Sequence, residues 1–338
     1  MTQIRIAHSP DADDAFMFYA LLQGRIDRPE GLEFVDVQED IESLNQKAMT
    51  GTYEVTAVSF HVYPYIADKY YLLTTGACFG DQYGPIVVSS KVLKPKQILK
   101  MRVGIPGKMT SAFLALKLYE HHVAGEGKSG ICYSQHPFDK ILEEVAEKKI
   151  DAGLIIHEGQ LTFGEKGLHK VVDLGEWWHK ETGHPLPLGG IAVRRDLDPS
   201  VLKTVAELIQ KSIEYGLEHR EESLAHALPF ARGMDAEKAQ KFIDMYVNNW
   251  TIDFGRSGFK AIKAFLDRGY REGILKEPVD LDGCVYDVKR GRVRGGGAEA
   301  VEEAPRGSAE GTAESTAPVT DENTLPMTEE PPSSEESR

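Results

Sequence analysis

Polar side chains follow the first predicted strand where it ends. Ser9 comes two positions after the predicted strand 4–7, with His8 between them, and an acidic segment with Asp11, Asp13 and Asp14 follows it. Ligands of open α/β sheets bind beyond the carboxyl ends of the strands, so Ser9 could present its hydroxyl to a ligand. Asp11 and Asp14 could instead cap the next helix and complement its dipole. The segment lacks the glycine and terminal glutamate of an EF-hand, which argues against a calcium loop.

Two further strand ends carry hydroxyl groups. Ser59 lies where an apolar strand stops, and it could cap a following helix or contact a ligand. The segment GIPGKMTS is similar to a phosphate loop, but two residues separate its glycines where the nucleotide pattern needs four, and Met follows the Lys. ATP and GTP are therefore excluded. Thr110 and Ser111, at the start of a predicted helix, would suit a carboxylate, although Thr110 could simply cap that helix.

A histidine ends the apolar strand AGLIIHE. His157 is the best candidate for a general base in the chain, because its unperturbed pKa lies near ~6.5. Glu158 does not open a zinc motif, since Leu161 stands where HExxH needs its second His. A GxSxG nucleophile elbow is also absent from the sequence. A general base and a purely structural histidine therefore stay alternatives for His157, and we predict no metal.

Composition divides the chain into a folded part and a tail. Residues 295–338 hold eleven acidic and two basic residues and no aromatic residue, and they carry −9 of the net charge of −14. Such a segment cannot bury enough apolar surface to offset the entropy of ordering, so we expect a disordered acidic tail. The remaining charge of −5 argues against nucleic acid as a partner, because phosphate contacts need clustered Lys and Arg.

Membrane and disulfide signals are weak. No stretch approaches the ~18 apolar residues that span a bilayer, and the start MTQIRIAHSPDADD has no apolar core of a signal peptide. Cys78, Cys132 and Cys284 are too far apart to form a CxxC metal pair or a disulfide framework. We expect a cytoplasmic protein without a membrane partner. The oligomeric state is left open, with a homodimer as one alternative.

Short apolar runs alternate with amphipathic helical patterns through the first half of the chain. This alternation predicts an α/β fold with a mostly parallel sheet covered on both faces. After Arg195 the pattern becomes helical, and no convincing strand is predicted there. We expect the side chains of Trp177 and Trp178 to pack in the interior. The segment Pro185–Leu186–Pro187 indicates a stiff hinge. Strands are expected at 4–7, 33–37, 55–59, 71–75, 86–89, 102–105, 130–133, 152–156, 170–173 and 190–193, and helices at 14–22, 41–49, 111–122, 138–147, 199–227, 235–248 and 257–268.

Several long segments carry a family resemblance. They are DIESLNQKA, LIIHEGQLTFGEKGL, VVDLGEWWHKETGHPLPLGGIAVRRDL and the patch Tyr246–Val247–Asn248. In this order they resemble the menaquinone-biosynthesis branch of the type II periplasmic-binding-protein fold, most closely the 1,4-dihydroxy-6-naphthoate synthase family, over about residues 4–268. The resemblance implies two α/β lobes with a central cleft: residues 1–88 plus 190–290, and residues 89–189.

The same resemblance implies an activity and a set of site residues. The reaction is the fragmentation of cyclic dehypoxanthinyl futalosine, a small anionic substrate, into 1,4-dihydroxy-6-naphthoate and a three-carbon fragment. Proton abstraction and elimination would suffice, without metal or organic cofactor. The base of the family matches His157. The ligand cleft matches Ser59, Thr110, Ser111 and Asp14.

The first loop departs from the family pattern Ser-Pro-Cys-Pro-Asn-Asp. This chain has Ser9–Pro10–Asp11–Ala12–Asp13–Asp14, so Asp13 adds a negative charge beside a cleft expected to hold an anion. A related enzyme of the same pathway with an altered substrate is therefore an alternative. A non-catalytic solute-binding protein for a small aromatic carboxylate is another. A protein that only binds its ligand needs no general base, so the role of His157 distinguishes an enzyme from a solute-binding protein.

Overall fold

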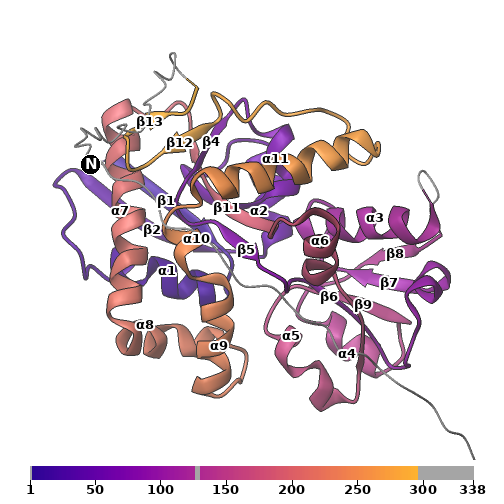
Figure 1. Cartoon of the computed structure of the whole chain (residues 1–338). Coiled ribbons are helices and arrows are strands. Elements are labelled where there is room, and N and C mark those ends of the chain that lie inside the picture. The colour runs from indigo at the N-terminus through magenta and orange to yellow at the C-terminus, as the bar shows by residue number, and fades with distance from the viewer. Residues whose placement is uncertain (1, 126–129, 296–338) are drawn as a thin grey trace, which may run out of the picture. The chain divides into compact units, whose positions relative to one another are not determined.

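The computed structural model describes residues 2–125 and 130–295, and the strands in these ranges form two sheets (Figure 1). Except for Gly295, the predicted acidic tail lies outside the described residues. Among the described residues, no helix is long and apolar enough to cross a membrane.

The first sheet is built from three separate parts of the chain. Its strands are β1 (Thr2–His8), β2 (Leu32–Gln38), β3 (Val55–Ser59), β4 (Tyr70–Leu73), β5 (Cys78–Gly80), β11 (Leu186–Arg194), β12 (Val285–Asp287) and β13 (Arg292–Val293). They follow the order β13-β12-β4-β11-β3-β1-β2, and β5 pairs with β11. The pairs of β1 with β2 and with β3 are parallel, whereas β11 runs antiparallel to β3, β4 and β5.

The second sheet comes from one continuous part of the chain. Its strands are β6 (Ile86–Ser89), β7 (Arg102–Ile105), β8 (Cys132–Gln135), β9 (Ala152–Ile155) and β10 (His169–Asp173), in the order β10-β6-β9-β7-β8. β7 is parallel to β8 and β9, and β6 is antiparallel to β9 and β10. The prediction of a mostly parallel sheet is therefore wrong. Both sheets are mixed, because β6 and β11 run against their neighbours where the chain passes between the sheets.

Helices lie between the strands and after them. They are α1 (Ala12–Leu22), α2 (Ile41–Ala48), α3 (Ser111–Ala124), α4 (Ile141–Ala146), α5 (Gly159–Thr162), α6 (Leu174–Thr182), α7 (Pro199–Glu218), α8 (Arg220–Ala227), α9 (Ala236–Tyr246), α10 (Asn249–Ile252) and α11 (Gly255–Arg271). Short 3-10 helices span Phe60–Tyr65, Pro95–Lys100, Phe163–Lys166 and Leu228–Phe230. In α11 the buried residues Ala261, Ile262, Phe265 and Leu266 recur at helical spacing, so one face of this helix enters the core.

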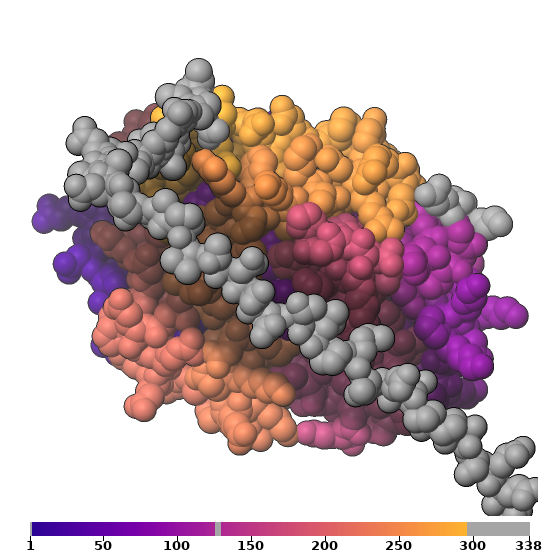
Figure 2. All heavy atoms as spheres, in the orientation of Figure 1, coloured from indigo at the N-terminus to yellow at the C-terminus, as the bar shows by residue number. Residues whose placement is uncertain are grey.

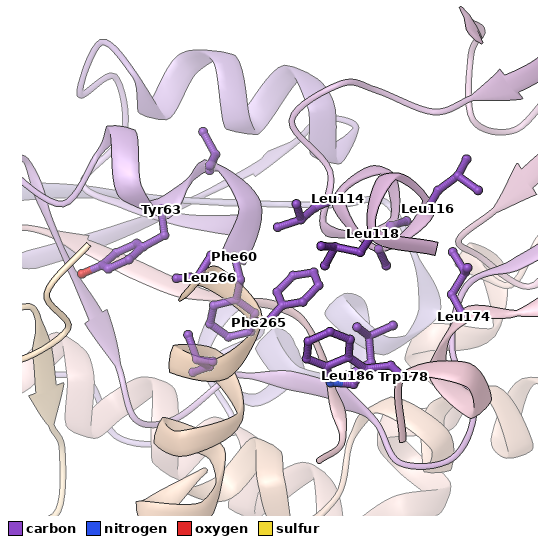
Figure 3. Packing of buried hydrophobic residues seen from close by; sticks show 14 of the residues in the cluster. Phe60, Tyr63, Leu114, Leu116, Leu118, Leu174, Trp178, Leu186, Phe265 and Leu266 are labelled. Carbon is purple, nitrogen blue, oxygen red and sulfur yellow. The ribbon is translucent and has the colours of Figure 1, made fainter. Parts of the chain in front are cut away.

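One apolar cluster contains strand residues from both sheets together with residues of several helices. It contains Val58 of β3 and Leu154 of β9 together with residues of α3, α6 and α11. Figure 3 shows Leu114 and Leu118 of α3 beside Trp178 and Phe265. The rings of Trp178 and Phe265 meet edge to face, with centroids 5.3 Å apart. The expectation that Trp177 and Trp178 pack in the interior is confirmed.

One local prediction is wrong. Short strands β12 and β13 occur after Arg195, where none was expected, and they complete one edge of the first sheet. The segment Pro185–Leu186–Pro187 overlaps the start of β11, where Pro187 pairs with Phe79 of β5, and its role as a stiff hinge stays a prediction. The register shifts between Pro187 and Gly189, which is how a strand accommodates a residue without an N–H donor.

Candidate functional site

A cavity of about 130 Å³ lies where loops from both sheets meet. The end of β3, the first loop, the start of α3 and the segment after β9 all contribute to its wall. Five of the six predicted site residues are in that wall: Ser9, Asp14, Ser59, Thr110 and Ser111. Residues that are up to about a hundred positions apart in the sequence thus share one cavity.

Hydrogen bonds within the first loop fix its shape. The carboxylate of Asp14 accepts the backbone N–H of Ser9 at 2.8 Å, and the Ser9 hydroxyl donates to Asp11 at 2.6 Å. Asp11 precedes α1, but its carboxylate bonds to Ser9 and pairs with Arg232 instead of the first turn of the helix. The expected capping by the Asp11 side chain is therefore wrong. The loop is held by contacts among its own residues and by Arg232.

Burial changes the charge of this loop. It raises the pKa of Asp14 to about 6, an effect that His8 opposes and Asp11 reinforces. Burial, together with the charges of Asp14 and Asp11, also raises the pKa of Asp13, which lies in the cavity wall. Both carboxyl groups hold protons at higher pH than ordinary aspartates. The loop therefore presents less negative charge, and more hydrogen-bond donors, than its sequence suggests.

The start of α3 provides donors to the same cavity. The Thr110 oxygen accepts the N–H of Phe113 at 3.2 Å and its hydroxyl donates to the Gly107 carbonyl at 3.0 Å, so the predicted cap is confirmed. The Ser111 oxygen accepts the N–H of His61 at 3.2 Å. The first N–H groups of any helix lack an intrahelical acceptor, and Ser111 and Ala112 line the cavity. This helix end can receive a carboxylate.

Asn45 orders the end of β3. Its amide nitrogen donates to the Ser59 hydroxyl oxygen at 3.0 Å, and its amide oxygen accepts the Ser59 N–H at 2.9 Å. The same amide nitrogen reaches the Met109 carbonyl at 3.3 Å. Ser59 thus bonds to Asn45 rather than capping the 3-10 helix that follows. Asn45 was not among the predicted site residues, although it lies within the family segment DIESLNQKA.

Glu42 of α2 also reaches the loop before α3. Its carboxylate accepts the Met109 N–H at 3.0 Å. A Cβ atom on Gly107 would lie 2.2 Å from the same carboxylate oxygen, so this close approach requires glycine. Glu42 and Asn45 belong to α2, which follows β2 of the first sheet. Together they hold α2 against the loop between β7 of the second sheet and α3.

His157 lies outside the cavity wall formed by the described residues, whereas Ile156 and Gln160 are part of it. The imidazole is 5% exposed; its Nε2–H donates to the Phe138 carbonyl at 2.9 Å and its Nδ1 accepts the Gly159 N–H at 3.0 Å. Burial lowers the pKa of His157. Nδ1 accepts the Gly159 N–H and so carries no hydrogen in this arrangement, and the lowered pKa favours the same neutral form. Its catalytic role stays a prediction.

Other residues of the wall were not predicted as site residues. The Tyr246 hydroxyl donates to the Gln160 amide oxygen at 2.8 Å, and Cys78 and Phe242 add a thiol and a ring. Burial raises the pKa of the Cys78 thiol. Tyr246 and Gln160 belong to segments that carried the family resemblance, which was the only signal for them in the sequence. Among the described residues, no group of three or more His, Cys, Asp and Glu is arranged to hold a metal.

An arginine contacts two acids that follow strands of different sheets, and one of them, Asp11, lines the cavity. Arg232, between α8 and α9, pairs with Asp11 and lies 2.6 Å from Glu158. Glu158 is 3% exposed; burial and the charge of Asp11 raise its pKa to about 7, against the effect of Arg232. Arg232 lies in a loop without a motif, so no sequence pattern pointed to it.

A family model described as menaquinone biosynthesis matches residues 4–271. Two relatives carry the name 1,4-dihydroxy-6-naphtoate synthase. The one from Thermus thermophilus is 36% identical over 275 residues, which cover 81% of this chain and 96% of the relative. The one from Streptomyces coelicolor is 34% identical over 273 residues, covering 80% and 94%.

Solved structures agree with the fold that the resemblance implied. A protein from Archaeoglobus fulgidus has 41% identity and a TM-score of 0.74, covering 81% of this chain and 98% of that one. A Candida albicans protein described as having the generic periplasmic-binding-protein fold has 14% identity and a TM-score of 0.61, covering 89% and 100%, which shows the fold alone. The predicted fold class and family resemblance are confirmed: the chain belongs to the menaquinone-biosynthesis family and is an enzyme.

Proposed function

We propose that this enzyme is a carbon–carbon lyase that converts cyclic dehypoxanthinyl futalosine into 1,4-dihydroxy-6-naphthoate and a three-carbon fragment. The names of its relatives support this reaction. The observation that carries the proposal is the cavity itself, whose wall brings together Ser9, Asp14, Ser59, Thr110 and Ser111. The sequence alone predicts each of these residues as a site residue, and chance would not gather them around one space.

The cavity suits a small carboxylate with further oxygen atoms. The start of α3 and Ser111 would receive the substrate carboxylate, because free helical N–H groups favour an anion. Asp13 and Asp14, when protonated, would donate hydrogen bonds to other substrate oxygens. Asp13 then does what the amide of an asparagine would do at this position. The substrate can therefore remain the one that the family uses, despite the altered loop.

His157 is proposed as the base. Its lowered pKa keeps Nδ1 unprotonated at neutral pH, so it can take a proton from a substrate carbon while elimination breaks the carbon–carbon bond. In the described arrangement Nδ1 accepts the Gly159 N–H, so this bond must open before the lone pair can reach substrate. Binding would have to shift the segment that joins His157 to Gln160 of the wall.

The two lobes are proposed to follow the two sheets. Strand pairing places Ile86–Ser89 in the second sheet and Leu186–Arg194 in the first. The chain would then pass between lobes in the segments 81–85 and 174–185, close to the boundaries expected at 88/89 and 189/190. The cavity would lie between the lobes, and their movement would admit substrate.

One assay tests the reaction. The purified chain is incubated with cyclic dehypoxanthinyl futalosine, and the naphthoate is sought by mass spectrometry; the absence of product would contradict the proposed reaction and favour the altered-substrate alternative. His157→Asn should reduce turnover by roughly 10²–10⁴-fold, the usual contribution of a positioned base. His219→Asn, at an exposed position after α7, is the matched control. Turnover by His157→Asn close to that of the control would remove His157 as the base.

Location and assembly complete the proposal. A biosynthetic role for the family supports the expected cytoplasmic location. A monomer and a homodimer are both compatible with a site built from one chain, and analytical ultracentrifugation distinguishes them.

A further inference from the structure

The Arg232 side chain makes contacts with four residues, of which Asp11 lines the cavity. Its guanidinium pairs with Asp11, lies 2.6 Å from the Glu158 carboxylate and donates to the Pro10 carbonyl at 3.2 Å. Its charged carbon also lies 4.8 Å from the centre of the Phe138 ring, a cation–π distance. The backbone of Arg232 has a φ of +48°, in the left-handed region that non-glycine residues rarely adopt.

These contacts belong to both sheets. Pro10 and Asp11 follow β1 of the first sheet, whereas Phe138 and Glu158 follow β8 and β9 of the second. One guanidinium therefore joins loops that come from different sheets. Other bonds cross nearby: Lys238 of α9 lies 2.6 Å from Glu165. Figure 2 shows the orange surface around α9 meeting the pink surface near residues 158–166 at the lower edge of this view.

The same residues hold the imidazole of His157. Its Nε2–H donates to the carbonyl of Phe138, whose ring lies under the guanidinium. Glu158, the next residue in the chain, is bonded to Arg232 through one carboxylate oxygen. Arg232 thus contacts both Phe138, whose carbonyl accepts the hydrogen bond from His157, and Glu158, which follows His157 in the chain. A shift of Arg232 would therefore also shift the residues that hold the His157 imidazole in place.

We propose that Arg232 is a positioning residue, which clamps the first loop to the His157 segment and thereby closes the cavity edge and fixes the imidazole. This inference rests on the proposed function only in making His157 the group that is positioned. The clamp itself is a property of the fold.

Electrostatics predicts how the clamp acts on His157. The charged groups that face the ring are Asp11, Asp139, Glu158 and Arg232. Burial lowers the pKa of His157 most, Asp11 and Asp139 act to raise it, and Arg232 acts to lower it. Removing the arginine leaves the acids unopposed. The pKa of His157 should therefore rise when Arg232 is replaced by a neutral residue.

Nuclear magnetic resonance of the full chain measures this directly. With ¹⁵N-histidine labelling, the His157 resonance, assigned by its loss in His157→Asn, is followed from pH 4 to 9. Arg232→Met should titrate at a higher pH than the wild type, and Arg232→Lys should return toward the wild type because it restores the charge. Lys238→Met removes a neighbouring exposed ion pair and should leave the titration unchanged. Melting temperatures show that each variant is folded.

Kinetics provides the second readout. Arg232→Met should lower kcat by about 10²-fold, the effect of misplacing a reacting group by about 1 Å. The acidic limb of its pH profile should also move to higher pH, because a base must be unprotonated to act. A small-angle scattering radius larger than that of the wild type would show that the edge has opened.

The outcomes separate the clamp from the proposed function. If His157→Asn keeps its activity while Arg232→Met shifts the His157 titration, His157 is not the base but the clamp stands. If Arg232→Met has the wild-type titration, the wild-type scattering radius and wild-type kcat, the clamp is overturned. Should Arg232→Met fail to fold, Arg232→Lys against Arg232→Gln gives the same comparison with polar side chains.

Discussion

Tyr246 donates its hydroxyl hydrogen to the amide oxygen of Gln160 over 2.8 Å, and this bond joins α9 to α5 in the cavity wall. The two side chains are 4% and 8% exposed, so neither polar group has ready access to bulk water. A buried acceptor that loses its donor keeps its desolvation cost. This bond therefore links the stability of the fold to the shape of the site.

Tyr246→Phe should loosen the wall. We expect a fall in the free energy of unfolding of about 1–3 kcal/mol, because the Gln160 oxygen loses its donor, and a higher KM. Urea unfolding and initial rates measure the two effects. Tyr286→Phe is the control, since this tyrosine packs against Tyr71 in the first sheet. Equal KM values for Tyr246→Phe and the control would show that the bond does not shape the site.

Gly107→Ala should disturb the loop before α3. Its new Cβ would lie 2.2 Å from the Glu42 carboxylate, so either the loop or Glu42 must move, at a cost of about 1–3 kcal/mol. Gly164→Ala is the matched control, because a Cβ there meets nothing within 4 Å. Thermal and urea unfolding measure both variants.

A double variant tests the cause. Glu42→Ala alone loses the bond to the Met109 N–H, but it also removes the atom that the new methyl group would meet. The cost of Glu42→Ala with Gly107→Ala should therefore be less than the sum of the single costs. Strict additivity would contradict a clash between these two residues.

Local patterns were enough to predict the strand ends and their polar residues. Val55–Ser59 is buried throughout and its sequence contains little except apolar and β-branched residues, so its end at Ser59 was visible. Thr110 stands directly before a long apolar helix, so the sequence indicated a cap as one of two roles for it. Such signals lie within a few residues of the side chain that they position. Strands of two or three residues, such as β13 and β12, have no comparable signal.

Local sequence patterns could not predict contacts between residues that are far apart in the chain. The strand directions of β6 and β11 depend on where the chain crosses between the sheets. An apolar run in the sequence does not indicate whether its strand pairs parallel or antiparallel with its neighbours. Arg232 matters because it meets residues 221 and 74 positions away in the chain, Asp11 and Glu158. His157 was correctly placed at a strand end, but its rotation toward the Phe138 carbonyl is decided by tertiary packing.

Asp13 should make stability depend on pH. Its pKa is raised above the ordinary ~3.9, so the folded chain holds a proton that the unfolded chain has lost. The free energy of unfolding therefore falls as pH rises above about 4, since the unfolded state then binds fewer protons. Asp13→Asn cannot titrate, and its stability relative to the wild type should increase from pH 4 to pH 8. Urea unfolding across this range measures the difference, with exposed Asp68→Asn as control. A constant difference would show that Asp13 is ionised in the fold.

Thr110→Val should separate binding from turnover. The hydroxyl of Thr110 caps α3, so its loss should lower stability by about 1 kcal/mol and misplace the helix N–H groups that would receive the substrate carboxylate. Asp198→Ala removes the cap of α7, whose residues lie outside the cavity wall formed by the described residues, and it is the matched control.

For Thr110→Val we expect KM to rise more than kcat falls, because the contact serves ground-state binding as well as the transition state. For the control we expect lower stability with unchanged KM. His157→Asn should do the opposite of Thr110→Val, with a loss in kcat and little change in KM. Steady-state rates at several substrate concentrations give both constants. If Thr110→Val and Asp198→Ala behave alike in KM, the cap of α3 acts on stability alone, and the carboxylate must be bound elsewhere in the cavity.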